Sequence, residues 1–170
     1  MRRAQDGSGR AALDQALAAL DEAFDRRAWH GTNLRGSVRG LDARTAAWRP
    51  GRGRHNVWEL VVHAAYWKYT VRRRLTGEKR GSFTLAGSNW FPRPGPHDTR
   101  GPERAWKADV ALMVAEHRRL RAAVAALPPR ALDGVSPGSA HTVRRMVLGA
   151  ALHDVYHAGQ IQMLKRLAPR

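Results

Sequence analysis

The sequence contains no cysteine, which excludes disulfide bonds, thiolate metal sites and a cysteine nucleophile. No apolar run approaches the ~20 residues that a membrane-spanning helix needs. The first ten residues are polar and lack the apolar core of a secretory signal. These absences predict a cytoplasmic protein with no membrane segment, and the lack of cysteine fits a reducing compartment.

Acidic residues are also scarce. There are 14 Asp and Glu residues against 30 Lys and Arg residues, so the formal net charge is +16. This excess favours an anionic partner, but it is equally explained by an arginine-rich genome that decorates solvated surfaces. The arginines are scattered and accompany no nucleic-acid-binding motif, so we do not expect nucleic-acid binding. The excess positive charge therefore has two remaining explanations, an anionic small-molecule substrate and the base composition of the genome.

The apolar residues that are present recur at helical spacing. Four segments, over about 10–28, 56–76, 102–127 and 142–167, place apolar residues every three or four positions, and none alternates as a strand would. A chain of 170 residues suits one domain with one core. We therefore predict an all-α four-helix bundle over residues 10–170, preceded by a flexible tail over residues 1–9.

Several residues mark where these helices begin. Asn56 and Glu59 form a variant of the capping box, Pro102 suits a first helical position, and Thr142 can cap the last helix. Asn33 and Asp42 can each cap a shorter helical piece between the first two long helices.

A long connection separates the second long helix from the third, over residues 77 to about 102. Loops of this length in a small domain are often lids or pocket walls. Trp90 and Phe91 lie within it, and both rings would be costly to expose to water. We therefore expect the loop to pack down over the bundle.

Two histidines organise the C-terminal helix. His153 and His157 are four residues apart, so both side chains lie on the same helical face. Apolar residues fall on or beside that stripe, which predicts that the face points inward. Imidazoles on a buried face need hydrogen-bond partners or a metal ion, and a pair one helical turn apart is a common half of a metal site.

A third histidine can complete such a site. His63 lies at the edge of the apolar stripe of the second long helix, and bundles bring side chains of different helices to their centre. Three imidazoles leave coordination positions open, as catalytic sites do. The alternative is that these are satisfied core or rim histidines. His117 also lies on an inward stripe, but nothing else in its surroundings indicates a ligand.

The segment His153–Ile161, with the sequence HDVYHAGQI, resembles the signature of the DinB-like (DinB/YfiT-like) superfamily of metalloenzymes. The segment Val57–Trp67 resembles the other motif of that family, a histidine on the second helix followed by an aromatic residue. The resemblance extends in order from about residue 13 to residue 167.

The resemblance implies a four-helix bundle in which His63, His153 and His157 hold a divalent metal ion, with zinc, nickel, manganese and iron as candidates. It implies an S-transferase that uses a low-molecular-weight thiol, as bacillithiol- and mycothiol-dependent members do, or a hydrolase, in either case acting on a small molecule. Members are often homodimers. The family name comes from damage-inducible expression, which points to stress response and implies no DNA chemistry.

Other residues of the C-terminal motif have two readings each. Asp154 lies about 100° around the helix from its histidine neighbour, so we expect it to pair with a surface arginine rather than orient a ligand. Gln160 can orient His157 or bond across the bundle. Tyr156 can donate a proton in the pocket, although a buried tyrosine with a satisfied hydroxyl is favoured. Gly159 is expected to permit close helix approach.

Three functions therefore compete. A metalloenzyme requires a metal that is open to substrate. A non-catalytic, metal-stabilised bundle that binds an acidic ligand would allow Trp90 or Phe91 to seal the metal. Charge-driven nucleic-acid binding would depend steeply on salt and would not need the histidines.

Overall fold

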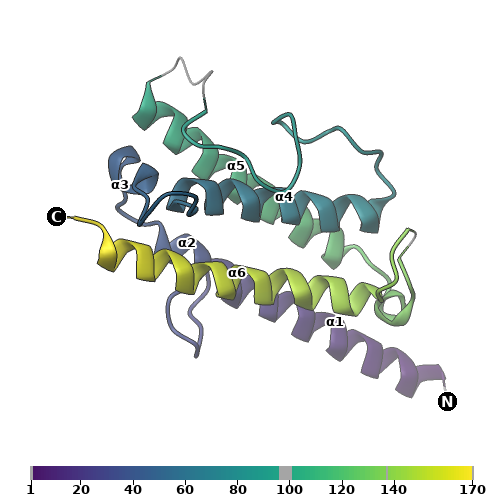
Figure 1. Cartoon of the computed structure of the whole chain (residues 1–170). Coiled ribbons are helices and arrows are strands. Elements are labelled where there is room, and N and C mark those ends of the chain that lie inside the picture. Colours follow the sequence, from purple (N-terminus) through teal and green to yellow (C-terminus); the bar gives the residue numbers. More distant parts are fainter. Residues whose placement is uncertain (1, 96–100, 137, 170) are drawn as a thin grey trace.

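The computed structural model describes residues 2–95, 101–136 and 138–169, and it is a bundle of long helices (Figure 1). The described residues form no β-strand. The predicted all-α four-helix bundle is confirmed. The long helices are α1 (Arg2–Phe24), α4 (Val57–Thr76), α5 (Pro102–Ala125) and α6 (Val143–Leu167), and the short ones are α2 (Leu34–Ser37), α3 (Ala43–Ala47) and the 3-10 helix η1 (Pro129–Asp133).

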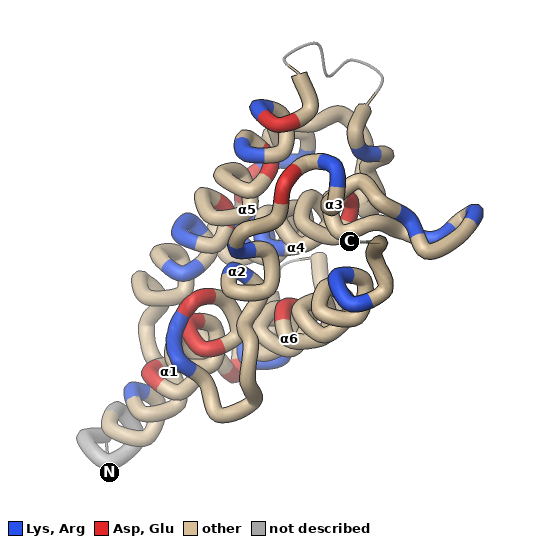
Figure 2. Tube along the Cα trace, turned by 90° about the vertical axis from the view of Figure 1, so that its left-hand side faces the viewer, with Lys and Arg blue, Asp and Glu red and all other residues tan. Residues whose placement is uncertain are grey.

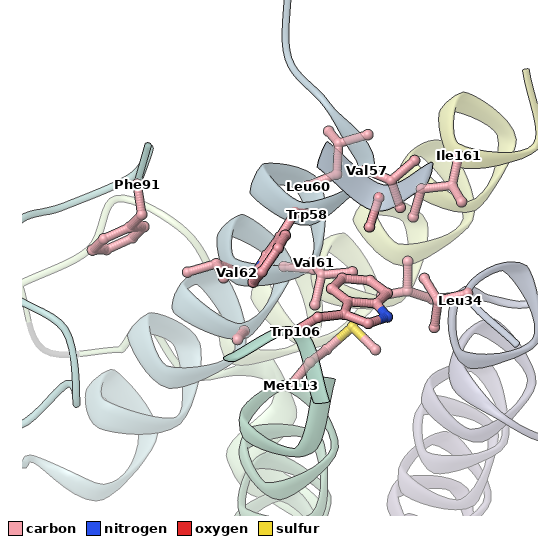
Figure 3. Packing of buried hydrophobic residues seen from close by; sticks show 14 of the residues in the cluster. Leu34, Val57, Trp58, Leu60, Val61, Val62, Phe91, Trp106, Met113 and Ile161 are labelled. Carbon is pink, nitrogen blue, oxygen red and sulfur yellow. The ribbon is translucent and has the colours of Figure 1, made fainter. Parts of the chain in front are cut away.

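Helix α4 packs against both α5 and α6, and α1 packs against α6 (Figure 1). One apolar cluster fills the space around the first half of α4, where the rings of Trp58 and Trp106 meet edge to face with centroids 5.5 Å apart (Figure 3). A second cluster lies between α1, the first half of α6 and the end of α5. This packing places α4 directly beside α6. These two helices carry the predicted metal ligands.

The predicted helix caps are present. The Asn56 side chain accepts a hydrogen bond of 2.8 Å from the Glu59 amide, and the Glu59 carboxylate accepts one from the Asn56 amide, which completes the capping box. The Thr142 side chain accepts a hydrogen bond of 3.2 Å from the backbone N–H of Arg145 at the start of α6, and Pro102 begins α5. Gly77 ends α4 with φ of 73°, a left-handed conformation that glycine adopts without strain.

The first helix begins earlier than the sequence predicts. We expected a tail over residues 1–9 and a helix from Arg10, but α1 begins at Arg2. Gly9 lies against η1, since a Cβ atom at this position would be 3.1 Å from the Cβ atom of Pro129. Glycines at positions 7 and 9 are typical of a tail, but the small size of Gly9 here allows close packing against η1.

The long connection between α4 and α5 packs onto the bundle, as expected for its aromatic residues. Phe91 is 5% exposed, and its ring contacts those of Tyr66 and Phe83. The side-chain amide of Asn56 donates a hydrogen bond of 2.9 Å to the backbone oxygen of Arg93. The described part of the connection is therefore fastened to α4 near the start of that helix.

The positive charge is distributed over the whole surface rather than gathered on one face. Figure 2 shows lysine and arginine on every long helix and on the loops, with acidic residues among them. Several arginines are paired with carboxylates, as Arg121 is with Asp21 at 2.6 Å. None of the described helices combines the length and apolar character needed to cross a membrane.

One core histidine lies away from the others and makes the fold sensitive to acid. The His117 ring stacks on Phe24 at 3.8 Å, and burial lowers its pKa from 6.5 to about 3. A base with a lower pKa in the folded state favours folding above about pH 6.5, and this contribution is lost as the pH falls toward 3. Between pH 7 and pH 5, we expect the free energy of unfolding of wild type to fall by about 2 kcal/mol more than that of His117→Phe. Urea unfolding with chelator present measures this, and identical pH dependence in both proteins would contradict it.

Candidate metal centre

Three histidines from two helices bring their ring nitrogens together. His63 comes from α4, and His153 and His157 come from α6. The Nε2 atom of His153 lies 3.1 Å from that of His63 and 3.0 Å from that of His157. One nitrogen from each ring falls within 4.8 Å of the others, so the group could hold a metal ion. Among the described residues, no carboxylate belongs to this group.

Hydrogen bonds on the far side of two rings fix where their protons lie. The Nδ1–H group of His63 donates to the backbone oxygen of Asn89 at 2.8 Å. The Nδ1–H group of His157 donates to the Oε1 atom of Gln160 at 2.7 Å. A neutral imidazole has one proton, so both Nε2 atoms carry lone pairs that point into the cluster.

This arrangement leaves lone pairs facing one another. The Nε2 atom of His153 carries at most one hydrogen, and it lies within hydrogen-bonding distance of both other Nε2 atoms. At least one of these contacts therefore joins two lone pairs, which repel unless a cation lies between them. Tetrahedral bonds of 2.0–2.1 Å to zinc separate ligand nitrogens by about 3.3 Å, close to the distances here. The residues thus fit a divalent ion.

Burial keeps all three imidazoles in the form that binds metals. It lowers the pKa of His153 to about 3 and that of His157 to about 4, and it also lowers the pKa of His63. Desolvation is the main cause in each case, because it penalises the charged imidazolium. The three rings are therefore neutral at physiological pH, as metal coordination requires.

The aromatic residues of the loop form a wall beside the cluster rather than a plug. The Trp90 ring stacks between His63, at 3.9 Å, and His55, at 3.6 Å. Stacking places the Trp90 ring over one flat face of His63 and not over the ring edge that carries Nε2. Phe91 packs against Tyr66 and other core rings. Neither the Trp90 ring nor the Phe91 ring therefore lies over the three Nε2 atoms. A purely structural metal site would have allowed such a seal.

A groove between α4 and α6 borders the cluster at His153. A hollow of about 630 Å³ is lined by His153 itself, by Trp67 of α4 and by the first half of α6. A second hollow of about 610 Å³ lies under the long loop, with Trp67 and Asn89 in its lining but no histidine. Trp67 thus forms a wall shared by both hollows, and the first of them borders the cluster at His153.

Asp154 does not have the surface partner that the sequence suggested. It is fully buried and forms an ion pair with Lys68 of α4, which is 2% exposed. The Lys68 ammonium also lies 5.2 Å from the centre of the Phe24 ring. The expected pairing with a surface arginine is wrong, because the direction 100° from His153 points toward α4 and not toward solvent.

Two further expectations for the C-terminal motif were wrong. Tyr156 is 63% exposed rather than buried, and its hydroxyl accepts a hydrogen bond of 3.1 Å from the Gln160 amide. Gly159 permits no close helix approach, because a Cβ atom there would meet nothing within 4 Å. Gln160, by contrast, orients His157, one of the two roles expected for it. His117 lies outside the cluster, against Phe24.

Sequence reasoning missed Asn89. Its backbone oxygen holds His63, and its side-chain oxygen accepts a hydrogen bond of 3.0 Å from the Trp67 indole. Its φ angle is 63°, a left-handed conformation in which asparagine is enriched. The preceding Gly87 and Ser88 indicate a turn, but nothing in the sequence reveals that this turn meets His63.

The contact between Gln160 and His157 gives a direct prediction. Gln160→Leu removes the acceptor that fixes the His157 proton, so we expect metal affinity to fall by about 10–100-fold. Gln162→Leu is the matched control, because Gln162 is on the same helix and bonds Thr32 instead. Competition with a chromogenic chelator measures both affinities. Equal affinities in the two variants would show that this hydrogen bond has no role in metal binding.

Comparison with known proteins agrees with the geometry. The profile of the DinB superfamily matches residues 26–161, which is most of the chain and includes all three histidines. The chain therefore belongs to the DinB superfamily. No curated protein and no solved structure gave a match.

Proposed function

We propose that this member of the DinB superfamily binds one divalent metal ion through His63, His153 and His157 and uses it to catalyse a reaction of a small molecule. The observation that supports this proposal is the convergence of three imidazoles, with the Nε2 atom of His153 about 3 Å from the Nε2 atoms of His63 and His157, whose protons are held on Nδ1. Imidazole ligands suit zinc, nickel and iron, so the ligand set alone does not select the metal.

A divalent ion in this site would supply Lewis acidity, which makes a coordinated water or thiol nucleophilic at neutral pH. The protein supplies the orientation. Asn89 and Gln160 keep the Nδ1 protons of their histidines in place, and Trp90 keeps water from one face of His63. These contacts hold the ligand nitrogens in position before the metal binds, which reduces the reorganisation required.

Two reaction classes use this chemistry: hydrolysis, and transfer of a low-molecular-weight thiol to an electrophile. We favour thiol transfer. No carboxylate of the described residues joins the cluster as a general base for water. A thiol is much more acidic than water and depends less on such a base. Arginines near the groove, such as Arg74 and Arg145, can bind the carboxylates that cellular thiols carry.

Turnover with and without metal tests this function. Zinc-, nickel- and iron-loaded protein is assayed with thiol and electrophile pairs and with activated esters. We expect activity that chelation removes and metal restores, and that falls at least about 100-fold in His157→Ala. His30→Ala is the control, because His30 is exposed and outside the cluster. Activity that survives both chelation and His157→Ala would contradict the proposal.

The alternative is a non-catalytic bundle that the metal stabilises. It predicts that metal raises the melting temperature without any turnover in these assays. The groove that reaches His153 favours the enzyme, because a purely structural ion gains nothing from access.

A further inference from the structure

The groove between α4 and α6 has an apolar floor. Val71, Met146 and Ala150 line it and are 6–8% exposed. Leu148 and Leu152 stand at its rim, and they are 37% and 69% exposed. Apolar side chains gathered around a hollow and left in contact with water are typical of a ligand site.

The two ends of the groove differ in chemistry. His153 of the metal cluster lines one end, beside Trp67, whose ring centre is 6.1 Å from that of His153. Arg74 and Arg145 line the other end. Arg145 precedes His153 by eight residues on α6, which corresponds to about 12 Å along a helix. The groove is therefore about as long as a medium-length alkyl chain.

The arginines at the far end are available to a ligand. Arg144 also lines the groove, but it is paired with Asp133 at 2.6 Å. Among the residues that the structure describes, no carboxylate is paired with Arg74 or Arg145. Two unpaired guanidinium groups beside an apolar surface are suited to a carboxylate or a phosphate.

We propose that this groove binds an amphipathic organic anion, with its apolar body along Val71, Met146 and Leu152 and its acid group at Arg74 and Arg145. The end of such a molecule that is remote from its acid group lies at His153. This inference rests on the proposed function, since it identifies the substrate class of the same site. The group of the substrate that reacts at the metal is therefore carried at the end opposite to the acid group, about 12 Å from the arginines.

The positive charge at the end of the groove favours this ligand over a second copy of the chain. A second copy carries the same formal charge of +16, so like charges oppose its approach to this cationic end. A neutral apolar molecule would leave both guanidinium groups without a partner. An amphipathic anion satisfies the apolar floor and the arginines together.

One residue of the lining leaves space for the ligand. Gly149 lines the groove, and a Cβ atom there would meet nothing within 4 Å. A larger side chain at this position can therefore project into the groove without disturbing the core. Gly159 lies on the same helix, is equally open and does not line the groove. The pair Gly149→Leu and Gly159→Leu thus separates blocking of the groove from a general effect on α6.

Calorimetric titration with octanoate tests the proposal on zinc-loaded protein and on protein stripped with chelator. We expect octanoate to bind in both states, and octanol and octylamine to bind at least about tenfold more weakly. Binding should weaken at least about tenfold in Gly149→Leu and in the double variant Arg74→Gln/Arg145→Gln. It should be unchanged in Gly159→Leu and in Arg118→Gln, which alters an exposed arginine of α5 outside the groove.

Three results would overturn the proposal. The first is absence of octanoate binding to wild type. The second is binding that requires zinc and ignores the arginine variants, which would place the acid group at the metal. The third is a change of molecular mass by light scattering in Gly149→Leu with octanoate binding intact, which would make the groove a protein interface. Failure of the metal function is distinguishable, because octanoate would then bind to a protein that retains no metal.

Discussion

Asp154→Leu is expected to lower the free energy of unfolding by about 3–5 kcal/mol. The substitution leaves the Lys68 ammonium without its partner in a site where the lysine is only 2% exposed. A buried charge without a partner loses the solvation that water would provide and gains nothing in return. Urea unfolding followed by circular dichroism, with chelator present, measures the loss independently of the metal.

The double variant Lys68→Met/Asp154→Leu is the control for this prediction. It replaces both charges with apolar side chains of similar size, so most of the lost stability should return. A single variant as stable as wild type would show that the pair is not buried as described. A double variant no more stable than the single one would show that lost packing, rather than the uncompensated charge, causes the destabilisation.

His153→Ala and His157→Ala are each expected to lower metal affinity by at least about 100-fold. Each removes one of three ligands, and the two imidazoles that are left bind a divalent ion much less tightly. His63→Ala tests whether α4 contributes the third ligand, and the same loss is expected. Competition with a chromogenic chelator measures each affinity.

His117→Phe is the control for these substitutions. It removes a buried histidine that stacks on Phe24 and lies outside the cluster, so metal affinity should be unchanged. Wild-type affinity in both His153→Ala and His157→Ala would mean that the ion binds elsewhere.

Local features of the fold were predictable from the sequence because local chemistry decides them. The capping box at Asn56 and Glu59 and the left-handed Gly77 depend only on neighbouring residues. The pairing of His153 with His157 likewise follows from helix geometry alone. The place of His63 beside them depends on which helices are neighbours, and the family resemblance supplied that information.

The orientation of each helix in the bundle was not predictable in this way. Helical periodicity alone does not decide whether Trp67 or Lys68 of α4 points inward. The structure buries Lys68 against Asp154 and places Trp67 at the groove. A rotation of α6 by a fraction of a turn decides whether Tyr156 is buried or exposed. The loop residue Asn89 carries no periodic signal at all, although it holds His63.

The excess of positive charge has a more specific meaning in the structure than in the sequence. Many arginines pair with carboxylates on the surface, as Arg144 does with Asp133. The arginines that matter for the substrate proposal are the two at the end of the groove, Arg74 and Arg145. Composition could not separate these two from the rest, because only the fold shows which arginines line the groove beside the three histidines.

Binding of a metal ion by the three histidines of the wild-type protein can be measured directly. Elemental analysis after zinc loading and removal of free zinc gives the stoichiometry, and X-ray absorption at the zinc edge gives the ligands. We predict about one zinc ion per chain with three imidazole nitrogens in its coordination shell. A protein that retains no zinc, nickel or iron, or a bound ion without imidazole ligands, would contradict the account.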